Sequence, residues 1–382
     1  MIFDLAIIGG GPVGSTLALA LRHAGLRIAI LEARPCLPSQ DPRALALSYG
    51  SRLLLDKLGI WSRLPQVSGI QTIHISQRRA FGRARLSANQ LAVPELGYVL
   101  PYADLQNALH QSLGSSAVDY LDAATVTDLQ AGADGVRLSY RRQDGEHSLV
   151  AKLAVVADGG KLLERSHPPE VHDYGQSAVI AHVSCARPQS GTAFERFTEQ
   201  GPVALLPYRD GYELVWTAAD AEAQAMLNWD DATFLHRLHQ HFGDRVGAFT
   251  AVGSRSCFPL RLKRAPEITL PRTVLLGNAA QTLHPVAGQG FNMGIRDAWE
   301  LAQIIQSCPV AELGGGAMLA RYAAARRLDR AGGIQFTDSL VQLFSNDWPL
   351  LRGGRALALT ALDCLPPLKS FVARRMMFGA NG

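Results

Sequence analysis

Three glycines at the spacing Gly9-x-Gly11-x-x-Gly14 follow a short apolar run, and Pro12 opens the helix-like segment that comes next. In such a turn the first glycine permits the bend, the second lets backbone approach a pyrophosphate, and the third lets helix and strand pack closely. The helix start offers free N–H groups and a positive dipole end to phosphate. Glu32 ends the following apolar run, where its carboxylate can accept hydrogen bonds from ribose hydroxyls. The pattern predicts a dinucleotide-binding turn without choosing between FAD and NAD(P).

Residues 276–297, LGNAAQTLHPVAGQGFNMGIRD, form a second stretch suited to ligand binding. Gly288 and Gly290 remove side chains, so a flat ligand can lie against bare backbone. A helix that begins near Gly290 would aim its N–H groups at an electron-rich edge of that ligand. A glycine-rich helix start without any ligand is the alternative.

Two further groups stand where a ligand is expected. Arg43 follows the first strand–helix–strand unit, where its guanidinium can meet a phosphate or simply face solvent. Asp158-Gly159 and Gly277-Asn278 each end an apolar run, and strand ends of a parallel sheet face the ligand in nucleotide-binding folds. Asp158-Gly159 also suits an ordinary turn.

The elements that must position these residues begin with a βαβ unit. Apolar runs at 5–8 and 26–31 predict parallel strands, and residues 12–24 predict the helix between them. Alternating runs within 117–157, 177–185, 202–208 and 212–218 predict antiparallel strands of a second lobe. From Gly290 to about residue 345 the pattern is helical. Pro349, Gly353 and Gly354 predict an interruption, and residues 355–362 predict one more short helix.

The composition fits a folded globular protein. The chain has 382 residues, 47% of them hydrophobic and 18% charged, which exceeds the usual size of one core and excludes a mainly disordered protein. A net charge of +4 does not favour nucleic acid as a partner. Five cysteines without metal-ligand spacing predict reduced thiols and no metal site, as in a cytoplasmic protein. No apolar stretch reaches the ~18 residues of a membrane span.

Together these segments resemble the FAD-dependent aromatic hydroxylases, the group A flavoprotein monooxygenases of the p-hydroxybenzoate hydroxylase fold. The run His284-Pro-x-Ala-Gly-Gln-Gly-x-Asn-x-Gly-x-x-Asp297 is similar to the signature of the ubiquinone-biosynthesis hydroxylases. The resemblance covers most of the chain and is loosest in the second lobe. It implies a mixed α/β fold: a Rossmann-like FAD-binding domain with a parallel sheet, an antiparallel substrate lobe and a helical C-terminal segment.

The resemblance also implies boundaries and roles. The FAD-binding domain would comprise 1–70, 98–175 and 265–345, the substrate lobe 71–97 and 176–264, and the C-terminal segment 346–382. The residues that would hold FAD are Gly9, Gly11, Pro12, Gly14, Glu32, Arg43, Gln106, Asp158, Asn278, Gly288, Gly290 and Asn292. His284, Pro285 and Gln289 would lie at the reacting centre, with His284 either handling the phenol proton or only bracing the turn.

One motif departs from the family. Its middle motif Asp-Gly-x-x-Ser-x-x-Arg becomes Asp158-Gly-Gly-Lys-Leu162-Leu-Glu-Arg165, with leucine in place of serine. Because that motif is linked to both FAD and NAD(P)H, the change puts the nicotinamide contact in question, although Lys161 can serve near a phosphate.

The implied reaction reduces FAD with NAD(P)H, adds O2 at flavin C4a and transfers OH from the hydroperoxide to a polyprenylated phenol of the 2-polyprenyl-6-methoxyphenol type. Hydroxylation of a soluble aromatic, reduction of prenyl chains and a non-catalytic FAD-binding scaffold are the alternatives. A long apolar tunnel would favour prenyl substrates, and a basic anchor a soluble acid. Tyr208, Tyr212 and Trp216 would either line a ring pocket or pack in the core.

The C-terminal sixth carries a net +5, since residues 321–382 hold nine Lys/Arg and four Asp/Glu. Arg352, Arg355, Lys369, Arg374 and Arg375 flank apolar runs there. Basic and apolar residues together suit an anionic membrane surface, so peripheral contact with the inner membrane is one expectation and a solvated helical tail the other. Association with other ubiquinone-biosynthesis proteins is a further expectation from the resemblance.

Overall fold

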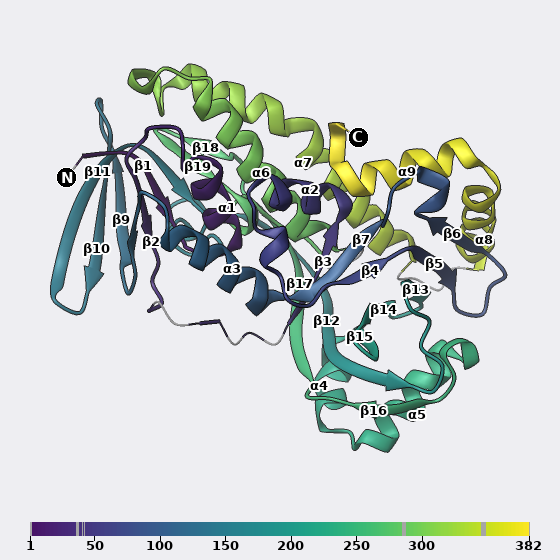
Figure 1. Cartoon of the computed structure of the whole chain (residues 1–382). Coiled ribbons are helices and arrows are strands. Elements are labelled where there is room, and N and C mark those ends of the chain that lie inside the picture. The colour runs from purple at the N-terminus through teal and green to yellow at the C-terminus, as the bar shows by residue number, and fades with distance from the viewer. Residues whose placement is uncertain are drawn as a thin grey trace.

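The computed structural model describes residues 2–35, 38–39, 41, 43–284, 288–344 and 349–381. Their strands form three sheets, of eight, nine and three strands. The first has the order β18-β19-β11-β1-β2-β8 (Figure 1). Its parallel part consists of β1 (Ile2–Ile8), β2 (Ile28–Leu31), β8 (Val118–Leu121), the end of β11 (Gly145–Val156) and β19 (Thr273–Leu275).

The predicted βαβ unit is confirmed, with slightly shorter elements. Helix α1 (Pro12–Ala20) joins β1 to β2 and packs between α3 (Tyr102–Gly114) and α6 (Gln289–Gln306). Strands β1 and β2 are buried almost completely, as the apolar runs require.

Strand β11 serves two kinds of pairing. Its first half pairs antiparallel with β10 (Val136–Arg142), which pairs with β9 (Thr125–Ala131). Its second half pairs parallel with β1 and β19. The alternating and continuous apolar runs of 117–157 therefore belong to the first sheet, and the prediction that the alternating runs form strands of the second lobe is wrong.

The second sheet is built mostly from the middle of the chain, in the order β20-β17-β12-β15-β14-β13-β5-β6, with β16 beside β12. Its strands are β5 (Thr72–Gln77), β6 (Arg83–Ser87), β12 (Glu170–Cys185), β13 (Thr192–Thr198), β14 (Gly201–Tyr208), β15 (Gly211–Ala219), β16 (Phe249–Val252), β17 (Ser256–Arg264) and β20 (Gln281–Thr282). Helices α4 (Asp220–Asn228) and α5 (Asp231–Phe242) lie along it at the bottom of Figure 1.

The strands of the smallest sheet lie between β2 and β8 of the first sheet along the chain, and β5 and β6 of the second sheet lie between its last two strands. It contains β3 (Ala44–Ser48), β4 (Ser68–Ile70) and β7 (Gly97–Pro101), and helix α2 (Tyr49–Lys57) follows β3. Strand β18 (Thr269–Leu270) extends the first sheet at its edge.

The C-terminal helices are longer and more numerous than the sequence predicts. Helix α7 (Gly316–Phe344) follows α6 after a break that contains Pro309, Gly314 and Gly315. Helices α8 (Pro349–Cys364) and α9 (Pro366–Phe378) follow it toward the C-terminus (Figure 1).

Helix α7 ends at Phe344, close to the end predicted near residue 345, and α8 begins at Pro349. The interruption predicted at Gly353 and Gly354 is wrong, because both glycines lie inside α8. Pro349 stands at the first helical position, where its missing N–H costs no hydrogen bond. The two glycines are exposed, and α8 packs on the molecule through the buried Ala356 and Leu359 that follow them.

Among the described residues, no single helix is long and apolar enough to cross a membrane. Residues Gly353–Cys364 and Pro366–Phe378 meet that test only as a pair, and they bend by 96° at their junction.

Candidate functional site

The glycine turn has the geometry that its spacing predicts. Gly9 has φ +106°, and a Cβ on Gly14 would lie 2.1 Å from the carbonyl oxygen of Gly9, so only glycine lets α1 approach β1 this closely. A Cβ on Gly11 would meet nothing within 4 Å. Gly11 caps α1 without any side-chain hydrogen bond, and Gly9, Gly11 and Pro12 line a large cavity. The N-terminus of α1 is thus presented to a ligand as bare backbone.

Glu32 is tied to this turn. Its Oε2 accepts a hydrogen bond from the Gly10 N–H at 2.7 Å, and its Oε1 accepts from Arg34 Nε at 2.9 Å. Gln106 lies behind the turn: its Nε2 donates to the Gly10 carbonyl at 2.8 Å, and it is absent from the cavity wall. The structure therefore gives Gln106 a supporting position and no direct contact with the cavity.

Two arginines stand at the same end of the cavity. Arg43 is bound to Asp41 at 2.6 Å and lies over the ring of Tyr102 at 5.3 Å. Arg34 also lines the cavity. Sequence reasoning missed Arg34, although its position two residues after Glu32 was a usable signal.

The strand ends at Asp158 and Asn278 meet on the cavity wall. The Asp158 carboxylate accepts hydrogen bonds from the Gly160 and Leu162 N–H groups, both at 2.8 Å, so it organises the turn. Asn278 is exposed toward the cavity, and Lys161 lines it as well. The side chain of Leu162 packs against the core of the first sheet and also borders the cavity.

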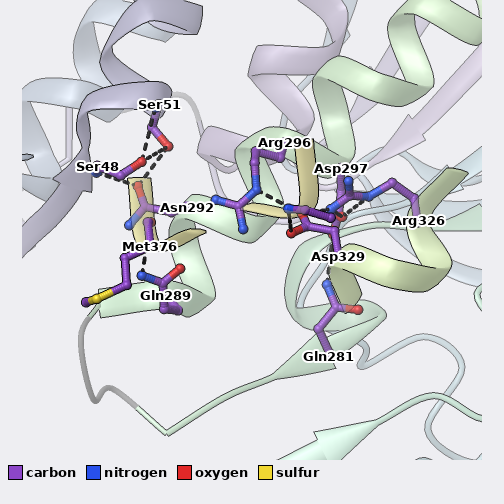
Figure 2. Close-up of polar contacts among 11 residues, drawn as sticks. Ser48, Ser51, Gln281, Gln289, Asn292, Arg296, Asp297, Arg326, Asp329 and Met376 are labelled. Atoms are coloured by element: carbon purple, nitrogen blue, oxygen red, sulfur yellow. Dashed lines mark hydrogen bonds and ion pairs between the residues drawn. The ribbon is translucent and has the colours of Figure 1, made fainter. Parts of the chain in front are cut away.

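Asn292 locks the glycine-rich loop in place. Its Oδ1 accepts from the Ser48 N–H at 2.8 Å and from Ser51 Oγ at 2.7 Å, while its Nδ2 donates to the carbonyls of Ala46 and Gly288 (Figure 2). The amide thus fastens the start of α6 to β3 and α2. Asn292 borders the cavity, but its polar atoms are committed to protein.

The remaining residues of that loop also line the cavity. Gly288 has φ +62° and caps α6, Gly290 follows it, and Gln289 Nε2 donates to the Met376 carbonyl of α9 at 3.3 Å (Figure 2). Pro285 lies outside the described residues.

His284 is buried on the cavity wall and meets the ring of Tyr174 edge-on at 5.5 Å. Burial lowers the pKa of its imidazole to about 4, so the ring is neutral at pH 7.

The cavity that these residues share has a volume of about 1050 Å³. Small-molecule pockets usually span about 300–1,000 Å³, so this one has room for a cofactor together with a substrate. It extends from the glycine turn past the loop at 288–292 to one face of the second sheet and to α7, α8 and α9.

The three aromatic residues for which the sequence allowed either a ring pocket or core packing belong to the core. Tyr208, Tyr212 and Trp216 are buried and absent from the cavity wall, and Trp216 packs edge-on against Phe234 of α5. Period-two alternation explains the outcome, because Val215 and Thr217 on either side of Trp216 face the cavity instead. Among the described residues, no group of three His, Cys, Asp or Glu side chains could hold a metal ion.

A nucleotide-binding turn that opens onto a large, mostly apolar cavity defines a dinucleotide-dependent oxidoreductase. Comparison with known proteins makes this more specific. Residues 3–336 match the family model described as FAD binding domain. The ubiquinone hydroxylase UbiL of Rhodospirillum rubrum is 33% identical, with 98% of this chain and 90% of that protein aligned. The 3-demethoxyubiquinol 3-hydroxylase of Escherichia coli is 30% identical, with 96% of each covered.

Solved structures agree on the fold. The p-nitrophenol 4-monooxygenase PnpA from Pseudomonas putida superposes with a TM-score of 0.79 at 19% identity, covering 99% of both chains. Klebsiella pneumoniae HpxO, solved in complex with FAD and uric acid, gives 0.78 at 18% identity, covering 99% of this chain and 98% of that one.

The chain belongs to the FAD-dependent ubiquinone-biosynthesis hydroxylases, within the group A flavoprotein monooxygenases. FAD is its cofactor, with NAD(P)H as the reductant typical of the family. The residues present fit FAD: the open backbone at Gly11 would receive the pyrophosphate, Glu32 would bind the ribose, and the bare loop at Gly288 and Gly290 would leave space for the flavin ring.

Proposed function

We propose that this protein hydroxylates the aromatic ring of a polyprenylated phenol of the 2-polyprenyl-6-methoxyphenol type in ubiquinone biosynthesis. The observation that carries the proposal is the substrate half of the cavity. Its wall consists of apolar side chains from the second sheet and the C-terminal helices, including Ile73, Ile75, Phe197, Leu340, Leu359, Leu362, Val372 and Met376. Such a wall suits a prenyl tail, because each buried CH₂ contributes about 0.8 kcal/mol.

The charge distribution argues against a soluble aromatic acid. The basic side chains on the cavity wall are Arg34, Arg43 and Lys161, and all three lie at the nucleotide end: Arg34 follows β2, Arg43 precedes β3, and Lys161 follows β11. The described wall of the substrate half carries no arginine or lysine to anchor a carboxylate. The names of the relatives UbiL and 3-demethoxyubiquinol 3-hydroxylase support the same substrate class.

Bound FAD supplies the acceptance of a hydride from NAD(P)H and the activation of O2. The protein's own residues bind and orient. The face of the second sheet and helices α7–α9 hold the phenol and its tail, Asn292 fixes the loop on which the flavin ring would rest, and the apolar wall excludes water from the reacting atoms. Because Leu162 replaces the serine of the family's middle motif, we place the neighbouring Lys161 near a phosphate of NAD(P)H.

Hydroxylation assays test the proposal. Purified protein reconstituted with FAD should convert a 2-polyprenyl-6-methoxyphenol to the hydroxylated quinol with NAD(P)H and O2. Equal turnover of a soluble hydroxybenzoate would favour the soluble-aromatic alternative. Absence of NAD(P)H oxidation by the flavin-loaded protein would favour the non-catalytic scaffold.

We further propose that α8 and α9 dock on an anionic membrane surface. Leu357, Leu365, Leu368 and Phe371 are exposed on these helices, and we call them the α8–α9 apolar face. The turn between β5 and β6, which carries the exposed Phe81, approaches α8, because Gly82 lies against the backbone of Ala356. Exposed apolar side chains gathered in this way indicate an interaction surface.

The same helices separate this face from the cavity. Leu359 and Leu362 of α8 and Val372 and Met376 of α9 line the cavity from inside. Exposed Arg83 and Arg85 on the neighbouring strand β6, with Arg374 on α9, supply positive charge around the apolar face. A membrane at this face would lie one helix layer away from the space proposed for the prenyl tail.

A further inference from the structure

One carboxyl group interrupts the apolar substrate half of the cavity. Glu195 lies near the middle of β13, and its neighbours across the ladder are Ala204 of β14 and Ile75 of β5, which also line the cavity. Glu195 carries no signal of function in the sequence, because a glutamate in an alternating strand is typical of a solvent-facing position.

The position of Glu195 along the cavity is intermediate. Ala193, two residues earlier on the same face, packs with Ile70 and Val99. These residues lie near β3, the strand to which Asn292 fastens the loop at 288–292. Phe197, two residues later, packs with Leu359 of α8 at the apolar end. Glu195 therefore stands between the region proposed for the flavin ring and the region proposed for the prenyl tail. This is where the aromatic ring of a tailed phenol must lie.

The surroundings leave the carboxyl group without a partner of its own. Glu195 Oε1 is buried and makes no hydrogen bond to any described residue. Burial alone raises the pKa of Glu195 to about 7, and no charged group contributes to that shift. An unsatisfied carboxyl in an apolar wall costs free energy, so its position calls for a ligand that bonds to it.

The titratable groups around it are few. The cavity-wall residues of β5, β6, β12, β14, β15, α7, α8 and α9 in the described chain are all non-titratable. His284, in the loop before α6, is the other titratable side chain on this half, and burial lowers its pKa to about 4. Arg196, the next residue on β13, points to the opposite face, where it lies near Arg245 and Arg78. Glu32, Asp158, Arg34, Arg43, Lys161 and Tyr102 belong to the nucleotide end.

We propose, on the basis of the function proposed above, that Glu195 is a catalytic residue that binds the phenol hydroxyl of the substrate and takes up its proton. The O–H bond breaks, the proton passes to Glu195 Oε1, and its electron pair stays on the phenol oxygen. The phenolate so formed makes the ring carbons ortho and para to it more nucleophilic toward the incoming oxygen. When the oxygenated ring regains aromaticity, its C–H bond breaks: the electron pair returns to the ring and the proton passes to solvent water. The protonated Glu195 then returns its proton to the phenolate oxygen.

Of the two candidate bases, Glu195 is better matched to this task than His284. A general base works best with a pKa near the operating pH, and a phenol titrates near ~10. His284 then has a packing role against Tyr174 on the wall of the same site.

The experiment compares wild type with Glu195→Gln, Glu195→Asp and the control Glu199→Gln, all loaded with FAD. Glu199 is exposed after the end of β13 and pairs with Arg79 at 3.8 Å, outside the cavity. Two readouts are followed from pH 5 to 9: the rate of hydroxylation of a 2-prenyl-6-methoxyphenol with a short tail, and the ultraviolet spectrum of that phenol bound to oxidised enzyme, which distinguishes phenol from phenolate.

We expect the wild-type rate to rise with pH through an inflection near 7. Glu195→Gln should keep its flavin, lose ~10²–10⁴-fold in hydroxylation rate, and lose both the inflection and the phenolate band. Glu195→Asp should retain the inflection at a reduced rate, and Glu199→Gln should match wild type. A Glu195→Gln enzyme with the wild-type inflection and phenolate band would overturn the inference.

The two proposals fail in different ways. If wild type shows no hydroxylation yet binds the phenol as phenolate in a Glu195-dependent manner, the proposed function is wrong and the role of Glu195 in phenol binding stands. If wild type hydroxylates and Glu195→Gln does so equally, only the inference about Glu195 is wrong.

Discussion

At the scale of single residues, the two glycines Gly11 and Gly14 have different duties within one motif. A Cβ on Gly14 collides with the Gly9 backbone, whereas a Cβ on Gly11 projects into open space where the pyrophosphate is expected. Gly14→Ala should therefore destabilise the apo-protein by ~1–3 kcal/mol through overpacking. Gly11→Ala should leave apo stability within ~0.5 kcal/mol but weaken FAD binding at least ~10-fold.

Urea unfolding of both apo-variants and titration with FAD separate these effects. Equal loss of apo stability in the two variants would mean that Gly11 also serves packing. Unchanged FAD affinity in Gly11→Ala would place the pyrophosphate elsewhere.

The side chain of Asn292 contributes to the free energy of unfolding through its hydrogen bonds. Asn292→Ala removes four hydrogen bonds and leaves the Ser48 N–H and the Ala46 and Gly288 carbonyls without that partner. We expect a loss of ~2–4 kcal/mol in the free energy of unfolding, since each buried unsatisfied group costs ~1–3 kcal/mol and water recovers part of it. Asn292→Asp keeps the acceptor and should lose less. Thermal unfolding of the FAD-loaded protein measures the stability of both variants. Equal stability of Asn292→Ala and wild type would contradict the role of Asn292 in fastening α6 to β3 and α2.

At the scale of elements, α6 and α7 are joined by a buried ion network. Arg326 bonds Asp297 on α6 and Asp329 on its own helix, and Arg296 bonds Asp329 at 2.9 Å (Figure 2). Arg326→Met should reduce stability by ~3–5 kcal/mol, because it leaves buried carboxylates without their counter-ion. The exposed neighbour Arg327→Met should change it by less than ~0.5 kcal/mol.

The network also predicts a pH dependence. Burial raises the pKa of Asp329, but the charges of Arg296 and Arg326 outweigh it, so the net pKa lies below its ordinary value. A lowered pKa in the folded state contributes stability above the unfolded value of ~3.9, and this contribution is lost as pH falls through the folded value. Wild type should lose stability on acidification below pH ~4 more steeply than Arg326→Met. Chemical unfolding at pH 3–6 measures the two slopes, and parallel slopes would contradict the assignment.

Some helices and strands can be predicted from the sequence alone, and others cannot. The βαβ unit and the strands at 136–142, 201–208 and 211–219 follow from local periodicity, and the predictions there are confirmed. The sequence predicts too late a start for α8, because Gly353 and Gly354 are poor helix formers. The buried Ala356 and Leu359 of the same helix pack on the molecule and outweigh that low propensity.

In the site, too, some residues can be predicted from local sequence patterns and others cannot. Gly9, Gly11 and Gly14 carry a local signal, whereas Glu195 becomes notable only when β5, β13 and β14 assemble around the cavity. Gln106 reaches the turn from behind through a contact 96 positions apart in the chain, a separation at which no pattern of neighbouring residues fixes orientation.

At the scale of the whole molecule, the α8–α9 apolar face predicts binding to vesicles. Wild type should float with vesicles that contain anionic lipid, and added salt should weaken the interaction. Leu357→Ser/Phe371→Ser should bind at least ~10-fold more weakly, since each exposed side chain contributes ~1.5–3 kcal/mol when fully buried. Val171→Ser/Leu328→Ser, which removes exposed apolar residues elsewhere, is the matched control. Equal flotation of the two double variants would contradict docking through this face.

The central claim is that one continuous cavity brings FAD and a tailed phenol together, and product analysis tests it most directly. The purified protein should show the visible bands of oxidised flavin. With NAD(P)H, O2 and a 2-polyprenyl-6-methoxyphenol it should release the singly hydroxylated quinol, with one oxygen atom from ¹⁸O₂ in the product. A flavin-loaded protein that oxidises NAD(P)H but returns every tailed phenol unchanged, without ¹⁸O, would contradict the account.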